Sequence, residues 1–202
     1  MRTLRLPLLA LPALAALCAT AAGAQNLFVN PDLDQDVVGW QLACGTTLTW
    51  SAVEDEAGCG GSGSLHATSG DCMGLQGGGG SQCIPVVAGE LISATGRVRG
   101  ATGFAGVAIF YHDTNDCSGP PIDQVTTAPV GATGDWQTVT YDDTVPAGAA
   151  SAALGFGIVD FAAVDVDVDA GYAGASPLVF RDGFDGNLDG ATTPCRWTST
   201  VP

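Results

Sequence analysis

Val164-Asp165-Val166-Asp167-Val168-Asp169 alternates apolar and acidic residues without a break. A β-strand directs successive side chains to opposite faces, so this alternation predicts a strand and not a helix. We expect the valines to be buried on one face and the aspartates to share the other face. A row of like charges is usually a solvated face. It would also suit a bound calcium ion, which prefers oxygen ligands.

Short strands with turn signals between them recur along the chain. We expect them at residues 40–43, 46–53, 64–68, 81–86, 91–99, 106–112, 136–141 and 151–159. In the last of these, Leu154 and Phe156 share one face, and Ala153 and Gly155 share the other. The four glycines at 77–80 favour no regular element. No amphipathic helix of ten or more residues is evident, so the chain is expected to be all-β, a sandwich or barrel.

The N-terminus has the pattern of a secretory signal peptide. Arg2 and Arg5 precede an apolar run over 6–22, and Ala22-Gly23-Ala24 is a small-residue cleavage site. We therefore expect a signal peptide at 1–24, a β-sandwich domain at 25–172 and an Asp/Gly-rich tail at 173–202. No later run is long enough to span a bilayer. The prediction is a secreted or periplasmic protein with no membrane contact after cleavage.

The expected mature chain is strongly acidic. It holds four arginines and no lysine against 21 acidic residues, a net charge of −17. Phosphates would be repelled, so nucleic acid is excluded as a partner. The charge suits an extracellular protein and is compatible with divalent cations.

Six cysteines remain after cleavage, an even number typical of a disulfide set in an exported chain. They are Cys44, Cys59, Cys72, Cys83, Cys117 and Cys195. Fifteen connectivities are open. If strands 46–53 and 64–68 run antiparallel, Cys44 and Cys72 would meet. No C-x-x-C pair exists, so a zinc site is not expected.

No arrangement typical of catalysis is present, and we expect the protein not to be an enzyme. Gly60–Ser64 lacks the last glycine of a G-x-S-x-G elbow, and neither His66 nor His112 lies in a catalytic motif. Asp185–Gly190 fits the first half of an EF-hand loop, but Arg196 stands where the closing Glu belongs. An Asp/Gly turn is the better interpretation there.

Five motifs and the closing Asp strand occur in a recognisable order over residues 26–170. The motifs are Asn30-Pro31-Asp32-Leu33-Asp34 with Gly39-Trp40; Gly63-Ser64-Leu65-His66; Ser81–Val86 with Gly89-Glu90-Leu91; Asp135–Val139; and Val145–Gly148. In this order they resemble carbohydrate-binding modules of the family 4/9 type, which have a galactose-binding-like jelly roll. Small exported bacterial proteins that carry this module are the most similar group.

The resemblance implies a jelly-roll β-sandwich of two antiparallel sheets, often with a structural calcium ion. It implies that Trp40 and Trp136 pack in the core, and that Cys83 pairs with Cys117. If Cys44 and Cys72 also pair, Cys59 and Cys195 are left and would join the tail to the body. The N-terminal turn would lie beside the closing strand. Calcium would therefore be held by Asp34 together with Asp165 or Asp167.

The function implied is weak binding of polysaccharide, without catalysis. Sugar binding needs open aromatic rings and polar groups. Trp50, Tyr111 and Tyr141 are the candidate ligand-binding residues, although all three would equally suit a core. The alternative is a structural or adhesive cell-surface scaffold, stabilised by calcium and disulfides and with no glycan ligand. The sequence specifies neither a glycan nor an oligomeric state.

Overall fold

A computed structural model describes residues 26–33, 36–42, 46–53, 63–69, 79–102, 104–127, 130–131, 133–158 and 164–175. The strands are β1 (Gln41–Leu42), β2 (Thr46–Ser51), β3 (Ser64–Ser69), β4 (Gly79–Pro85), β5 (Leu91–Thr102), β6 (Phe104–His112), β7 (Asp123–Thr126), β8 (Val130–Gly131), β9 (Gln137–Thr144), β10 (Ser151–Ile158) and β11 (Val164–Gly174). The described residues contain no helix long and apolar enough to cross a membrane.

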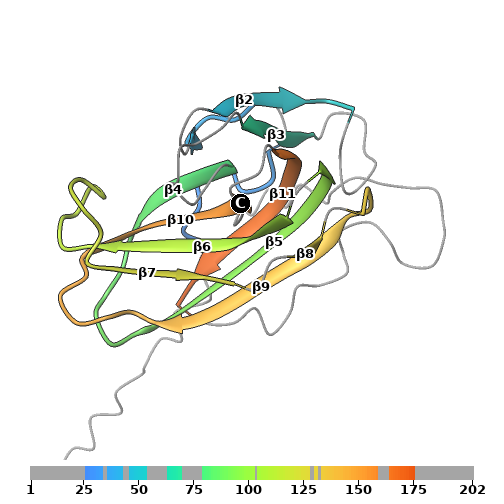
Figure 1. Cartoon of the computed structure of the whole chain (residues 1–202). Coiled ribbons are helices and arrows are strands. Elements are labelled where there is room, and N and C mark those ends of the chain that lie inside the picture. The colour runs from blue at the N-terminus through green and yellow to red at the C-terminus, as the bar shows by residue number, and fades with distance from the viewer. Residues whose placement is uncertain are drawn as a thin grey trace, which may run out of the picture.

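The strands form two sheets that pack face to face (Figure 1). The six-stranded sheet has the order β1-β4-β10-β6-β7, with β8 paired to β6, and the five-stranded sheet has the order β2-β3-β11-β5-β9. All pairings are antiparallel. From β3 to β6 and again from β9 to β11, each strand lies in the other sheet from the one before it. The predicted jelly-roll sandwich is confirmed.

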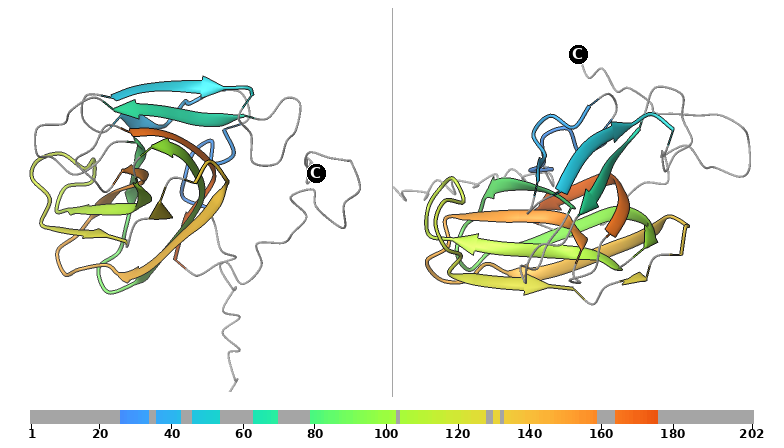
Figure 2. Two further views of the ribbon diagram at one scale, coloured as in Figure 1. Left: turned by 45° about the vertical axis from the view of Figure 1, so that its right-hand side comes forward. Right: turned by 45° about the horizontal axis from the view of Figure 1, so that its top comes forward.

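The core lies between the sheets and is built from the apolar positions of each alternation. Val166 and Val168 of β11 are buried, as predicted, and Leu154 and Phe156 of β10 face them from the other sheet. Figure 2 (left) shows the five-stranded sheet curving from β2 and β3 round to β9. At Gly96 of β5, an added Cβ would lie 2.6 Å from the Phe156 ring, so only glycine fits there.

The N-terminal segment 26–33 is tied to the end of β11. Leu27 N donates to Ala173 O at 2.7 Å, and Gly171 N donates to Pro31 O at 2.8 Å. The N-terminal turn therefore lies beside the closing strand, as the resemblance implied. The contact is six residues, roughly 20 Å of strand, away from Asp165. Ala173 belongs to the core and β11 runs to Gly174, so the sandwich continues past the expected boundary at 172.

Two features of the sheets were not predicted. Gly79 and Gly80, from the run that was expected to favour no regular element, begin β4. A Cβ on Gly80 would collide with the Leu65 side chain, so the close approach of β3 requires glycine at this strand position. The short strands β7 and β8 were also missed, because neither has a long alternation.

Candidate functional site

The acidic row of β11 lies on the outer face of the five-stranded sheet, opposite the buried valines. The expectation that the whole row is solvated is wrong. Asp167 and Asp169 are only 7% and 4% exposed, whereas the Asp165 side chain is 49% exposed. The reason is topological, because β11 is a central strand between β3 and β5. Long side chains on both neighbours extend over its acids.

Asp167 is held by one residue from each neighbouring strand. His66 on β3 and Arg99 on β5 are its cross-strand partners in the register. His66 Nδ1 lies 2.8 Å from Asp167 Oδ1, and Arg99 Nη2 donates to Asp167 Oδ2 at 3.0 Å. One cation, Arg99, and one ring nitrogen of His66 therefore offset the negative charge of Asp167.

The tautomer of His66 follows from these contacts. Beside the Arg99 guanidinium, Asp167 is a carboxylate and can only accept hydrogen bonds. His66 Nδ1 must then carry the proton that it donates. In the neutral imidazole this leaves Nε2 as an acceptor. His66 Nε2 lies 3.7 Å from Asp165 Oδ1.

Trp136 lies against this group and not in the core, so the core assignment of Trp136 is wrong. The Arg99 guanidinium lies 5.1 Å from the centroid of the Trp136 ring, a cation–π contact. Arg97 donates to Thr138 Oγ1 at 2.6 Å and contacts Trp136 O at 3.4 Å. Trp136 directly precedes β9, where it packs beside the arginines of β5. Trp40, by contrast, is buried, as the resemblance implied.

We call this surface the polar face. Its residues are His66, Thr68, Arg97, Arg99, Trp136, Thr138, Asp165 and Asp167. It combines a half-buried aromatic ring with fixed acceptors and donors on four neighbouring strands, β3, β11, β5 and β9. Groups of these two kinds bind sugars, whose rings have apolar faces and hydroxyl edges.

The three predicted ligand-binding aromatics lie elsewhere. Trp50 is half-buried on the inner side of β2, and its indole nitrogen donates to Leu33 O at 2.7 Å. Tyr141 is half-buried and packs on the core. Tyr111 has no exposed surface, so the expectation that its ring could face outward is corrected. Its hydroxyl donates to Asp143 Oδ2 at 2.8 Å. Burial, then this hydrogen bond, raises the pKa of Tyr111.

The outward aromatic of β6 is Phe110, the neighbour of Tyr111. It is half-buried on the outer face of the six-stranded sheet. Around it lie small or polar residues of the paired strands: Ala108, Gln124, Ala153 and Gly155. We call this surface the small-residue face. The signal for it was the alternation of Phe110 and Tyr111, which left open which of the two rings is inside.

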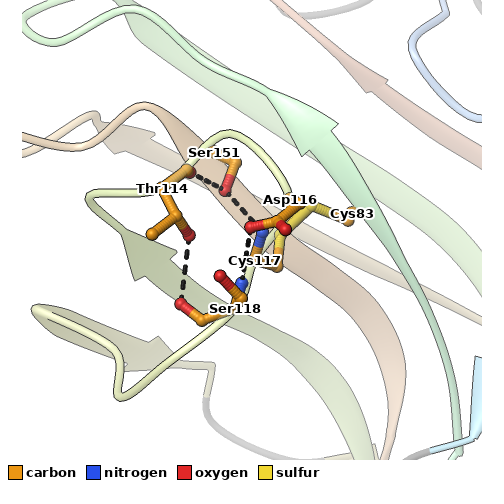
Figure 3. The surroundings of a disulfide bond; sticks show 6 residues. All are labelled: Cys83, Thr114, Asp116, Cys117, Ser118 and Ser151. Atoms are coloured by element: carbon orange, nitrogen blue, oxygen red, sulfur yellow. Dashed lines mark hydrogen bonds between the residues drawn. A yellow bond between two sulfur atoms is a disulfide. The ribbon is translucent and has the colours of Figure 1, made fainter.

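The disulfide between Cys83 and Cys117 is present, with Cα atoms 5.9 Å apart, and confirms the predicted pair. It joins β4 to the loop after β6 (Figure 3). Ser151 fixes this loop, because its hydroxyl accepts from Cys117 N and donates to Thr114 O. Hydrogen bonds from Ser118 lower the pKa of Asp116 in the same loop.

The metal hypothesis concerns Asp34, Asp165 and Asp167, and Asp34 lies outside the described residues. Within the described part of the chain, no group of three or more His, Cys, Asp or Glu side chains is arranged to hold a metal ion. Both oxygens of Asp167 already have partners. The calcium site stays a prediction. The expected signal peptide at 1–24, Asp185–Gly190 and four cysteines (Cys44, Cys59, Cys72 and Cys195) also lie outside the described residues.

No family model and no curated protein sequence matches this chain. Solved structures do match in fold. The tandem CBM22-1–CBM22-2 domain of Paenibacillus barcinonensis Xyn10C has a TM-score of 0.58 and 18% identity, over 82% of this chain and 50% of its own. The CBM22-1 xylan-binding domain of the same protein has a TM-score of 0.54 and 17% identity, over 71% of this chain and 90% of its own.

A third similar structure is the enzymatically active domain of tailspike protein 4 from bacteriophage CBA120. Its TM-score is 0.56 at 16% identity, over 74% of this chain and 21% of the tailspike chain. This chain thus spans about a fifth of the tailspike protein and half of the tandem domain. At these identities the likeness is one of fold alone, and two of these three structures are carbohydrate-binding modules.

Proposed function

We propose that this chain is an exported, non-catalytic module that binds polysaccharide weakly through the polar face. One observation carries the proposal. Trp136, Arg99 and Asp167 form a continuous series of contacts that ends in His66 and Asp165. The series places an aromatic ring and a pair of partly exposed acceptors on one surface.

The fold supports the same class of ligand. The CBM22-1 domain with this fold is a xylan-binding domain. The net charge of the full sequence is −15, so neutral glycans are favoured over acidic ones, which the chain would repel.

The binding is expected to be weak because the aromatic contact is small. Trp136 is half-buried, and Arg99 lies over its ring. Only part of the ring is then left to stack on a sugar. Each hydrogen bond to a hydroxyl adds only about 1 kcal/mol, because it replaces a hydrogen bond to water.

The non-catalytic role follows from the sequence, in which neither His66 nor His112 lies in a catalytic motif.

One observation favours the alternative, a scaffold with no glycan ligand. The exposed large hydrophobic residues in the described ranges are all aliphatic: Val29, Val38, Val53, Val87, Leu91 and Ile122. A strong glycan-binding module would present a row of open aromatic rings. The Cys83–Cys117 disulfide would serve a scaffold equally well.

Affinity electrophoresis separates the two functions. The folded protein is run through native gels that contain soluble xylan, mixed-linkage β-glucan or galactomannan. We expect measurable retardation on at least one of them. A folded sample that migrates freely in all three supports the scaffold, and turnover of a glycoside or ester would contradict both functions.

Export is supported by the disulfide and by the N-terminal pattern of basic, apolar and small residues. The expected product is a mature chain that begins at Gln25 and is found outside the cytoplasm. N-terminal mass spectrometry of fractionated cells checks this. Uncleaved chain in the cytoplasmic fraction would contradict it.

A further inference from the structure

Two hydrogen-bond acceptors on the polar face lie side by side. His66 Nε2 and Asp165 Oδ1 are 3.7 Å apart, and their side chains are 31% and 49% exposed. That separation is longer than a hydrogen bond. In the neutral imidazole the proton is on Nδ1, where it is donated to Asp167, so Nε2 is an acceptor.

Neither acceptor of this pair supplies a hydrogen-bond donor to the other. In the described residues, Asp165 contacts His66 Nε2 and accepts no hydrogen bond. Two neighbouring lone-pair groups repel each other slightly and are best satisfied by two donors from outside. We infer that His66 Nε2 and the Asp165 carboxylate bind two adjacent hydroxyl groups of a neutral sugar. This inference rests on the proposed function and names the recognition chemistry of its site.

The spacing fits a vicinal diol. Two hydroxyl oxygens about 3 Å apart can each donate to acceptors 3.7 Å apart through hydrogen bonds of about 2.8 Å. A single hydroxyl has one proton and would satisfy only one acceptor. A carboxylate or sulfate of an acidic glycan brings no donor and is repelled by Asp165. The pair therefore selects neutral sugars with free adjacent hydroxyls.

The acceptor pair is held in place before a ligand arrives. Asp167 orients the His66 ring through Nδ1, and Arg99 orients Asp167. A preorganised site loses less conformational entropy when it binds.

The test uses soluble xylan and the same xylan after O-methylation, which removes hydroxyl donors. The variants are Asp165→Asn and His66→Gln, with Glu90→Gln as the matched charge control. Glu90 is exposed in the turn before β5, whereas Asp165 pairs with Thr102 at the other end of that strand, roughly 30 Å away. Thermal melts confirm that each variant is folded.

We expect Asp165→Asn to weaken retardation by xylan roughly tenfold, because a charge-assisted acceptor is lost. Glu90→Gln should bind like the wild type, and methylated xylan should not retard the wild type. His66→Gln should also weaken retardation by xylan, because the imidazole acceptor is lost.

The outcomes separate this inference from the proposed function. If xylan retards the wild type and Asp165→Asn equally, the diol pair is wrong while the binding function stands. Equal binding of methylated xylan also overturns the pair. If the folded wild type is retarded by none of the three glycans, the proposed function fails and the inference fails with it.

Discussion

The polar face and the small-residue face arise from strands with the same alternation but differ in what stands at the outward positions. On β11 these positions are acids, and residues of β3 and β5 cover them. On β6 they are Ala108 and Phe110, which need no polar partner. The difference shows that alternation determines which residues face outward. The neighbouring strands determine whether outward residues are solvated.

The largest expected effect is on the small-residue side, where the disulfide closes the loop after β6. Replacing Cys83 and Cys117 together by Ser should lower the free energy of unfolding by about 3–4 kcal/mol, because the unfolded chain regains the entropy of an open loop. Urea denaturation measures this. A loss below about 1 kcal/mol would show that the loop is held mainly by its hydrogen bonds through Ser151.

On the polar face, replacing Asp167 should cost much more stability than replacing Asp165. Asp167→Ala should cost about 2–3 kcal/mol, because Arg99 and His66 lose a buried partner but remain partly hydrated. Asp165→Ala should cost under about 0.5 kcal/mol, because its carboxylate is half exposed. Parallel denaturation of the two variants compares them. Equal losses would mean that the burial of Asp167 contributes nothing to stability.

Tyr111→Phe tests the buried residue that follows Phe110 on β6. The loss of the hydrogen bond to Asp143 should cost about 1–2 kcal/mol at neutral pH. Because the pKa of Tyr111 is raised in the folded state, its stabilisation is complete below about pH 10 and declines above it, where the unfolded chain ionises first.

The alkaline loss should therefore be smaller in Tyr111→Phe. It should not vanish, since burial also raises the pKa of Tyr141 and Tyr172. Melts across alkaline pH compare the variant with the wild type. An identical pH dependence would contradict the role given to Tyr111.

Calcium should have the smallest effect. A site at Asp34, Asp165 and Asp167 would add about 2.7 kcal/mol at a hundredfold excess over its dissociation constant. We expect calcium to leave the melting temperature unchanged, because His66 and Arg99 already occupy both oxygens of Asp167. Thermal melts with calcium and with a chelator measure this effect. A shift that disappears in Asp165→Ala would establish the site.

Much of the fold could be predicted from the sequence, because periodicity and turn residues are local signals. The candidate site could not be predicted from the sequence, for two reasons. The pairing of Asp167 with His66 and Arg99 joins strands that are distant in sequence, and register is not visible in one strand alone. The sequence could not show whether Phe110 or Tyr111 points into the core. Shifting the alternation of the strand by one residue exchanges its two faces, and either ring would suit the core.

The most direct test of the central claim compares one aromatic from each face. Trp136→Ala and Phe110→Ala both remove a half-buried ring, the first from the polar face and the second from the small-residue face. Their migration is measured in native gels with and without the glycan that retards the wild type. The proposed function predicts that Trp136→Ala migrates freely and that Phe110→Ala is retarded like the wild type. Retained retardation in Trp136→Ala, with its loss in Phe110→Ala, would place binding on the opposite sheet and contradict the account.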